Sequence, residues 1–300
     1  MSFATKKQKM GKVLDWKIEF HQTSGLRTLI DVVSNILTRI NLYVTQDENG
    51  NTHLGIDSID PQQVCMIQSQ LSVEKSVGIV DKKEFCIDAS IFNLFLKNLP
   101  SHYSLNIEQY ENTPDLRIFA YESLNNNHTT EMFMPTYMEN TESMNLGKKT
   151  YDYTIEMDLL TLRQFIKMTQ ALQAKHITLK VFEPKDSDPT QKNTMFTIES
   201  DDGDSRYKQS FYSSTIKDSV EDTCIIKAQP DQGKHSSKID WVCKFDEDYS
   251  TSYMSNFLKS MDRQVITIQL TESNPFIMHY SLSTDGCYLR FVLAPKNRDD

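Results

Sequence analysis

The stretch YDYTIEMDLLTLRQFIKMTQALQAKHITLKV, residues 151–181, decides the fold class expected for this chain. Its beginning, near 151–156, and its end, 177–181, alternate apolar and polar residues, as half-buried strands do. Between them, apolar residues return every three or four positions behind Asp158, a residue type that favours helix N-caps. This helix, residues 159–172, is expected to bury Leu159, Leu162, Phe165 or Ile166, and Thr169. The stretch therefore predicts a strand, a helix and a second strand.

The same order occurs at three other places. Helical periodicity is expected in the segments 23–37, 89–98 and 250–261. A strand pattern precedes them, near 14–20, 84–88 and 238–245. Several short strands follow each helix, separated by turn signals such as the Asp-Gly run at 201–204. The chain is therefore predicted to be an α+β protein in which a strand–helix–strand–strand–strand unit occurs four times, two in each of two similar domains.

The inward stripe of each further helix follows from the same periodicity. The first helix, with Thr23 or Ser24 as its cap, is expected to bury Leu26, Leu29, Ile30, Val33, Ile36 and Leu37. The second, capped by Asp88, is expected to turn Ile91, Leu94 and Phe95 inward. The fourth is expected to bury Met254, Phe257, Leu258 and Met261.

Composition shifts divide the chain into four segments. Residues 1–12 form a basic N-terminal arm with Lys6, Lys7, Lys9 and Lys12, which is predicted to be flexible. The first domain is expected to span 13–136 and the second 151–300. Residues 137–150, YMENTESMNLGKKT, are polar and lack periodicity, which is typical of an interdomain connector.

Several functional classes lose support from the sequence. No run of 18 apolar residues occurs, so an ordinary membrane helix is excluded. The five cysteines include no CxxC pair and suit buried thiols in a reducing compartment, so a cytoplasmic or nuclear location is expected. Glycine-rich phosphate loops, HExxH and GxSxG motifs are missing. No catalytic residue, metal site or cofactor is therefore predicted, although a missing motif does not exclude an enzyme.

Charge is distributed unevenly along the chain. The total is −9, yet the four helical segments with their exits hold eight basic and three acidic residues. The basic ones are Arg27, Arg39, Lys97, Arg163, Lys167, Lys175, Lys259 and Arg263. Such residues can serve solubility alone. If the helices share one surface, they form a positive strip for the phosphate backbone of DNA. Arg163 and Lys167 are expected to face away from the apolar stripe of their helix.

Several motifs resemble one protein family. The run YLRFVLAPK, residues 288–296, is similar to the "YYLAPK" ending of proliferating cell nuclear antigen, the eukaryotic and archaeal sliding clamp. Residues 55–66, GIDSIDPQQVCM, resemble that family's "GVxLxSMDSSHVSLV" stretch, and residues 256–259 and 275–280 fall in family order. The resemblance extends over nearly the whole chain from Val13 onward. Length, divergence and the additional N-terminal segment are most similar to a viral member.

The resemblance implies a function. It implies a homotrimeric ring that encircles double-stranded DNA without reading its sequence, with helices lining the hole and antiparallel sheets outside. The strands near 129–135 and 206–212 would join neighbouring copies. Arg27 and Lys167 fall at or near positions where the family has basic pore residues. Ser34 and Asn93 stand where basic residues are expected, which predicts a less positive hole.

The resemblance also implies a groove for short peptide motifs of DNA polymerase, ligase or other replication and repair proteins. The implicated residues are Ile59, Gln63, Met66, Met144, Leu146, Pro275, Val292, Leu293, Ala294 and Pro295. Gln63 replaces a frequent histidine and Val292 an aromatic residue, so peptide preference is expected to differ. Ile59, Met66 and Leu293 also fit an ordinary core.

Three hypotheses remain open at this point. The first is the trimeric clamp. The second is a monomeric processivity factor with the same fold, which binds DNA by charge without encirclement. The third is an enzyme whose site the linear pattern hides. Ring closure separates the first two, because it requires open strand edges at opposite ends of the subunit.

Overall fold

The structure is a computed structural model. It describes residues 13–122, 129–137, 151–185, 192–215, 224–227, 229–230, 240–261, 265–272, 274–282 and 287–296. None of the helices in these parts is both long and apolar enough to span a bilayer.

The described residues of the first half form two helices and nine strands. They are β1 (Leu14–Phe20), α1 (Ser24–Ser34), β2 (Arg39–Gln46), β3 (Thr52–Ile59), β4 (Cys65–Ser72), β5 (Lys75–Val77), β6 (Lys83–Asp88), α2 (Ala89–Asn98), β7 (Tyr103–Tyr110), β8 (Asp115–Glu122) and β9 (Thr129–Pro135).

The second half repeats this order. Its elements are β10 (Tyr153–Asp158), α3 (Leu159–Ala171), β11 (His176–Pro184), β12 (Lys192–Asp201), β13 (Arg206–Thr215), β14 (Cys224–Lys227), β15 (Gln229–Pro230), β16 (Trp241–Ser250), α4 (Thr251–Leu258), β17 (Val265–Leu270), β18 (Phe276–Ser281) and β19 (Tyr288–Leu293). The four predicted strand–helix–strand–strand–strand units are confirmed, with β5, β14 and β15 added to them.

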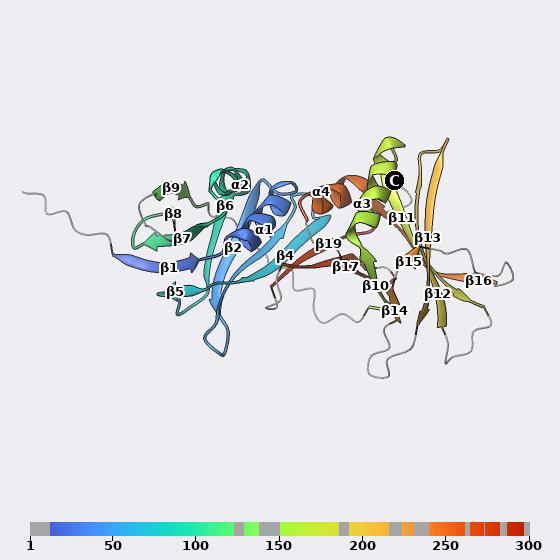
Figure 1. Cartoon of the computed structure of the whole chain (residues 1–300), viewed down its shortest axis with the longest axis horizontal. Helices are drawn as coiled ribbons and strands as arrows, with labels where there is room; N and C mark the ends of the chain where they lie inside the picture. Colours follow the sequence, from blue (N-terminus) through green and yellow to red (C-terminus); the bar gives the residue numbers. More distant parts are fainter. Residues whose placement is uncertain are drawn as a thin grey trace, which may run out of the picture.

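The strands form three sheets. The two outer sheets have the orders β5-β1-β7-β8-β9 and β15-β13-β12-β11-β16, and a nine-stranded sheet, β14-β10-β17-β18-β19-β4-β3-β2-β6, runs between them. The two halves meet in this middle sheet, where β19 pairs antiparallel with β4. The helices lie along one side of the molecule in the order α2, α1, α4, α3 (Figure 1).

Side-chain caps explain where two of the helices begin. Asp88 accepts a hydrogen bond from the backbone N–H of Ile91 at 2.9 Å, and Asp158 accepts one from Thr161 at 2.8 Å, so both predicted caps are confirmed. Thr23 precedes α1 without such a bond, since its hydroxyl accepts from the Arg27 side chain instead.

The stripe predicted for α2 is wrong. Ile91 and Leu94 are 48% and 64% exposed, and Phe95 is only partly buried, whereas Ala89, Phe92 and Leu96 face the core. The physical reason is that α2 is apolar around most of its circumference, so periodicity alone could not select a side. Its packing beside α1, β2 and β6 makes that selection.

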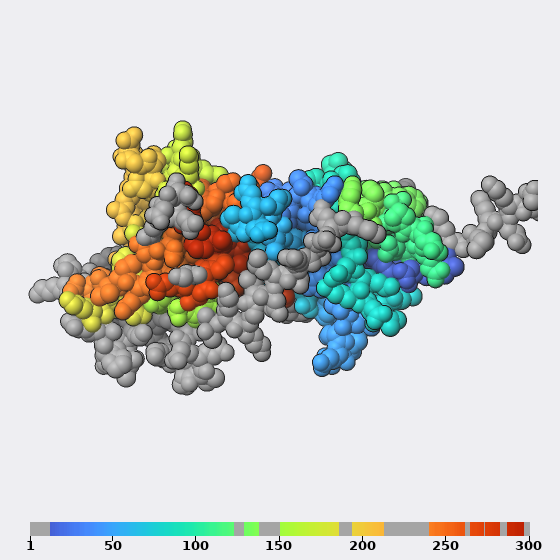
Figure 2. Space-filling model, turned by 180° about the vertical axis from the view of Figure 1, so that it is seen from behind, coloured from blue at the N-terminus to red at the C-terminus, as the bar shows by residue number. Residues whose placement is uncertain are grey.

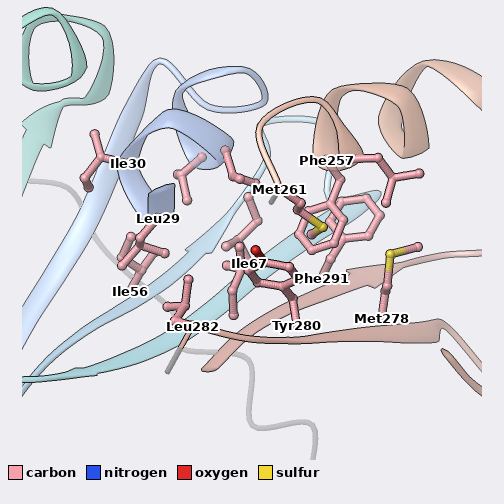
Figure 3. Close-up of a cluster of buried hydrophobic side chains, with 14 of the residues drawn as sticks. Leu29, Ile30, Ile56, Ile67, Phe257, Met261, Met278, Tyr280, Leu282 and Phe291 are labelled. Carbon is pink, nitrogen blue, oxygen red and sulfur yellow. The ribbon is translucent and has the colours of Figure 1, made fainter. Parts of the chain in front are cut away.

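One hydrophobic core continues through both halves. Leu29 of α1 lies beside Ile56 of the middle sheet, and Phe257 of α4 lies beside Phe291 (Figure 3). The rings of Phe257 and Phe291 stack at 4.2 Å between centroids. The residues predicted to be inward in 159–172 and 250–261 are all buried, as are those of 23–37 except Ile36, which is partly buried.

The cysteines follow the prediction in part. Cys65, Cys86 and Cys287 are buried and form no disulfide, as expected. Cys243, on the edge strand β16, is exposed, so the expectation is wrong at this position.

Candidate functional site

The side of the molecule that carries the helices is one candidate site. Contacts between α1 and α2, between α1 and α4, and between α3 and α4 join them into one row. Asn35, which ends α1, donates to the Ser260 hydroxyl behind α4 at 3.3 Å, so polar contacts also connect the two halves. Seven of the eight predicted basic residues lie within the described ranges, and Arg263 lies outside them.

Arg27 of α1 binds the end of the neighbouring helix. Its guanidinium donates to the backbone oxygens of Leu99 at 2.8 Å and Pro100 at 2.7 Å, just beyond α2. Leu99 is the C-cap residue of α2 and Pro100 follows it, so both oxygens lie just past the end of the helix. Burial lowers the pKa of Arg27, which still remains charged at neutral pH. This arginine therefore fastens α1 to α2, and most of its donors are not directed at solvent.

Arg163 of α3 makes the equivalent connection in the second half. Its Nε and one terminal nitrogen donate to the backbone oxygen of Leu258 at 2.9 and 2.7 Å, and the side chain also binds the oxygen of Met261. The expectation that Arg163 faces away from the packed side of its helix is therefore wrong. A change at this position would disturb the end of α4 as well as the surface charge.

A polar cluster neutralises the helix face of the first half. The carboxylate of Asp31 accepts from Asn93 at 2.9 Å and forms an ion pair with Lys97. Asn93 also donates to the Ser34 hydroxyl at 2.7 Å. Burial would raise the pKa of Asp31, but hydrogen bonds from Lys97, Ser260 and Asn93 outweigh it and lower the pKa. Ser34 and Asn93, the two departures from the family pattern, thus belong to a cluster around one carboxylate.

The remaining basic residues differ in whether their charge is already paired within the protein. Arg39 is exposed and stacks on the Tyr137 ring at 4.1 Å. Lys167, Lys175 and Lys259 are exposed, and none of them has an ion-pair partner within the described ranges. All three belong to the second half. Apart from Arg39, the exposed positive charge of these predicted residues that lacks an acidic partner within the described ranges is therefore concentrated on and beside α3 and α4.

An open depression of about 470 Å³ lies beside Lys175, between the end of α3 and the start of α4. Gln170, Gln173, Ser252 and Ser255 also line it, and Gln170 donates to the Ser255 hydroxyl at 2.9 Å. Amide, hydroxyl and ammonium donors suit phosphate oxygens. This composition is compatible with contacts to the phosphate backbone of a nucleic acid.

The opposite face of the middle sheet carries part of the predicted groove. Ile59, Met66 and Val292 lie side by side on β3, β4 and β19, and Ile277 of β18 continues the row. Met66, Ile277 and Val292 form a small hydrophobic cluster apart from the main core, with Ile59 and Tyr151 packed against it. From behind, atoms of the first half and the red C-terminal strands meet in the middle of the molecule (Figure 2).

The other predicted groove residues divide into three groups. Leu293 is fully buried in the main core, because neighbouring residues of a strand face opposite sides of the sheet, so its assignment to the groove is wrong. Gln63 is exposed, and Pro275, Ala294 and Pro295 are half-buried near this row. Met144 and Leu146 lie outside the described residues. Sequence reasoning missed Ile277, because it lies in an uninterrupted apolar run from Phe276 to Met278, and only its pairing with Val292 identifies its face.

A buried aspartate connects this row to the helices. The carboxylate of Asp60 accepts from the backbone N–H groups of Val64 at 2.8 Å and Cys65 at 2.6 Å, which closes the turn between β3 and β4. It also accepts from the hydroxyl of Tyr253 on α4 at 2.6 Å. Burial, together with the bond to Asp60, raises the pKa of Tyr253. The turn that precedes Met66 is thereby fastened to the second half.

Two sheet edges lie at opposite ends of the molecule (Figure 1). Strand β9 ends the first sheet, with β8 as its one neighbour. In the third sheet, β15 pairs with β13 only at Phe211 and Tyr212. The edge of β13 is thus open from Arg206 to Ser210 within the described part of the chain.

Among the residues that the structure describes, no group of three or more histidine, cysteine, aspartate or glutamate side chains could hold a metal ion.

No protein-family model and no curated protein sequence matches the chain. Solved structures do resemble it. Proliferating cell nuclear antigen from Entamoeba histolytica aligns with a TM-score of 0.69 at 13% identity, covering 95% of this chain and 100% of that one. The protein from Thermococcus kodakaraensis gives 0.66 at 14% identity, with 94% and 100% covered. The PCNA2–PCNA3 complex from Sulfolobus tokodaii gives 0.66 at 14%, with 93% and 99%.

Proposed function

We propose that this chain, which has the fold of the proliferating cell nuclear antigen clamps, is a DNA sliding clamp. Three copies would close into a ring around double-stranded DNA and tether replication and repair enzymes to it. The chain itself would act as a non-enzymatic scaffold. Its length, divergence and additional N-terminal segment look most like the clamp-like protein of African swine fever virus, so we further propose a viral protein that works at a cytoplasmic replication site or in the nucleus.

The observation that carries this proposal is the pair of open strand edges at opposite ends of one subunit. An exposed edge is a template for strand addition, and proteins usually cover it. When two different edges of a subunit join head to tail, the contact is heterologous and closes into a ring if the rotation allows. Strands β9 and β13 supply such a pair.

Exposed apolar side chains lie on the helices nearest to these edges. Ile91 and Leu94 are exposed on α2, near β9, and Leu160 and Met168 are 60% and 45% exposed on α3, near β13. Phe165 of α3 packs on Tyr207 of β13 at 4.9 Å, which fixes this helix beside its strand. Joining the edges would bring the two apolar groups together and remove them from water.

The decisive experiment measures solution mass by sedimentation over a dilution series from high to low micromolar concentration. A trimer that dissociates reversibly is expected. Glu131→Pro should favour monomers, because proline cannot donate a ladder hydrogen bond. A strictly monomeric wild type would refute encirclement and favour the runner-up, a monomeric factor that holds DNA by charge.

Retention on circular DNA also distinguishes a ring that encircles DNA from a monomer that binds it by charge. A ring loaded on a nicked circular plasmid should survive a wash at high salt and should leave after the plasmid is cut once. A protein held by charge alone should leave during the wash, because counterion competition removes phosphate contacts. Equal loss from circular and linear DNA would contradict the ring.

Partner enzymes would dock on the outer face at the row Ile59, Met66, Val292 and Ile277. Short motifs usually bind apolar grooves through a few aromatic or aliphatic anchors. Methionine at position 66 would let the wall adapt to varied ligands. A peptide ending in paired aromatic residues is expected to bind, and Ile59→Ala combined with Leu146→Ala should weaken it at least tenfold while the ring remains assembled. Unchanged affinity in calorimetry would place the docking site elsewhere.

A further inference from the structure

The two outer sheets carry rows of alternating charge on the faces that point away from the core. In the first sheet, the ammonium group of Lys17 on β1 lies 3.7 Å from Glu108 on β7. Glu108 lies 3.0 Å from Arg117 on β8, and Arg117 forms an ion pair with Glu131 on β9. Across four adjacent strands the signs therefore run plus, minus, plus, minus.

The third sheet has the complementary row. Asp246 on β16 lies 3.4 Å from Lys180 on β11, and Lys180 lies 3.4 Å from Glu199 on β12. Glu199 is 3.0 Å from Lys208 on β13. The signs run minus, plus, minus, plus toward the open edge. The row in the first sheet ends on a negative charge at its edge, and this row ends on a positive one.

The terminal members of the rows are accessible, whereas the inner acids are not. The side chains of Glu131 and Lys208 are 40% and 44% exposed, against 9% for Glu108 and 7% for Glu199. Each terminal charge has a partner inside its own subunit, and its other side borders the sheet edge. An opposite charge placed there would extend the row.

We propose that Glu131 of one copy lies directly opposite Lys208 of a second copy, and that this pair sets the register of an antiparallel joint between β9 and β13. The inference rests on the proposed ring and names the contact that orders it. Eight strands would then carry an unbroken alternation of charge across the joint. Both sheets are antiparallel at every pairing within them, so an antiparallel joint continues their pattern.

The two faces of the strands agree with this register. Met132 and Met134 of β9 and Tyr207 of β13 face the core, whereas Glu131 and Lys208 face outward. Pairing Glu131 with Lys208 puts Met132 opposite Tyr207, so apolar side chains meet apolar ones. A shift by one residue would bring outward charges against inward apolar residues.

The length of the open edge agrees as well. In this register residues 129–133 of β9 lie opposite residues 206–210 of β13, which precede the two residues that pair with β15. The outward ring of Phe133, 57% exposed, then faces the guanidinium of Arg206, a pairing that favours cation–π contact. A shift by two residues toward the start of β13 would pair Glu131 with Arg206, which also binds Glu199, but it would place Phe133 opposite Asp204, beyond the end of the strand. The opposite shift would place Thr129 opposite Tyr212, which β15 already pairs.

Charge reversal tests the register. Glu131→Lys alone and Lys208→Glu alone should each weaken association at least tenfold in sedimentation at low salt, because like charges across an interface are costly. The variant with both changes should recover to within about threefold of the wild type. Glu84→Lys is the matched control: Glu84 is 56% exposed, pairs with Lys82 and lies on the edge strand β6 of another sheet, so association should not change.

Cysteine pairs give a second test that does not depend on charge. In a chain with Cys243→Ser, Glu131→Cys with Lys208→Cys should form disulfides between copies, since residues directly opposite lie within disulfide reach. Glu131→Cys with Ser210→Cys, offset by two positions, should crosslink far less. If the doubly reversed variant associates no better than the single ones, or if the offset pair crosslinks equally, the register is wrong although the ring stands. A wild type that never associates overturns the ring and this inference together.

Discussion

The two helix pairs have the same construction and different charge. In each half, an arginine of the first helix reaches the carbonyl groups at the end of the second: Arg27 binds Leu99 and Pro100, and Arg163 binds Leu258 and Met261. Around α1 and α2, the remaining lysine is neutralised by Asp31. Around α3 and α4, the exposed lysines have no such partner within the described residues.

This difference separates residues that hold the helices together from residues that are available to bind DNA. The arginines belong to the scaffold, since both halves need a donor at the same helix end. The lysines can vary without disturbing the fold, and here they gather in one half. We therefore expect DNA to contact the α3–α4 side of each subunit more strongly than the α1–α2 side. A ring would then present alternating strong and weak arcs to the phosphate backbone.

The largest effect is expected from removing the arginine contacts. Arg163→Met should lower the free energy of unfolding by about 3 kcal/mol, because hydrogen bonds to a charged donor are lost and carbonyl groups remain unsatisfied. Arg27→Met should cost about 2 kcal/mol, since its bond to Pro100 is exposed. Urea unfolding measures both. Lys167→Met on the same helix as Arg163 is the control, and an equal loss in that variant would contradict the scaffold role.

The next effect concerns DNA affinity. Replacing Lys167, Lys175 and Lys259 by glutamine should weaken binding to duplexes of any sequence, on the order of a hundredfold at low salt, and should reduce the salt slope by about 2.7. Lys97→Gln, in the first half, should change the slope by less than about half a unit. Fluorescence anisotropy over a salt series checks this. Equal salt slopes for the triple variant and the wild type would show that these lysines do not contact DNA.

The comparison also indicates what sequence can and cannot predict. Caps such as Asp88 and Asp158 act within one helical turn, so residue type and spacing were enough to find them. The stripe of α2 failed because six of its ten residues are apolar, and only contacts with distant elements choose which of them are buried.

The charged residues illustrate the same limit. A count of basic residues on the helices treats Arg163 and Lys167 alike. Arg163, however, binds the carbonyl group of Leu258, 95 residues away, whereas Lys167 is exposed to solvent. That difference depends on where α4 ends beside α3, which no local pattern contains. The groove differs, because the family resemblance and not a local pattern predicts Met66 and Val292 there, and the strand pairing places them side by side.

A smaller effect of opposite sign should follow from removing the carboxylate of the first half. Asp31→Asn keeps the shape of the side chain and releases Lys97 from its ion pair. DNA binding should then become about threefold tighter at low salt, because one more cation is available to phosphate. The gain should vanish in the double variant Asp31→Asn with Lys97→Gln. A gain that persists there would show that Asp31 acts through general charge alone.

The smallest effect concerns the pH dependence of stability. Although burial opposes it, hydrogen bonds from Lys97, Ser260 and Asn93 lower the pKa of Asp31 below its value in the unfolded chain. A carboxylate whose pKa is lower in the folded than in the unfolded protein contributes stability. This stability is present above the pKa of the unfolded state and disappears as the pH falls through the pKa of the folded state. The difference in unfolding free energy between the wild type and Asp31→Asn should therefore stay constant from about pH 7 to pH 5 and shrink below about pH 4. Urea unfolding of both proteins at each pH measures it, and the subtraction cancels carboxylates elsewhere, such as Glu19 and Glu199, whose pKa values are also lowered. A difference that persists unchanged at low pH would mean that Asp31 stabilises the helix pair by packing and not by charge.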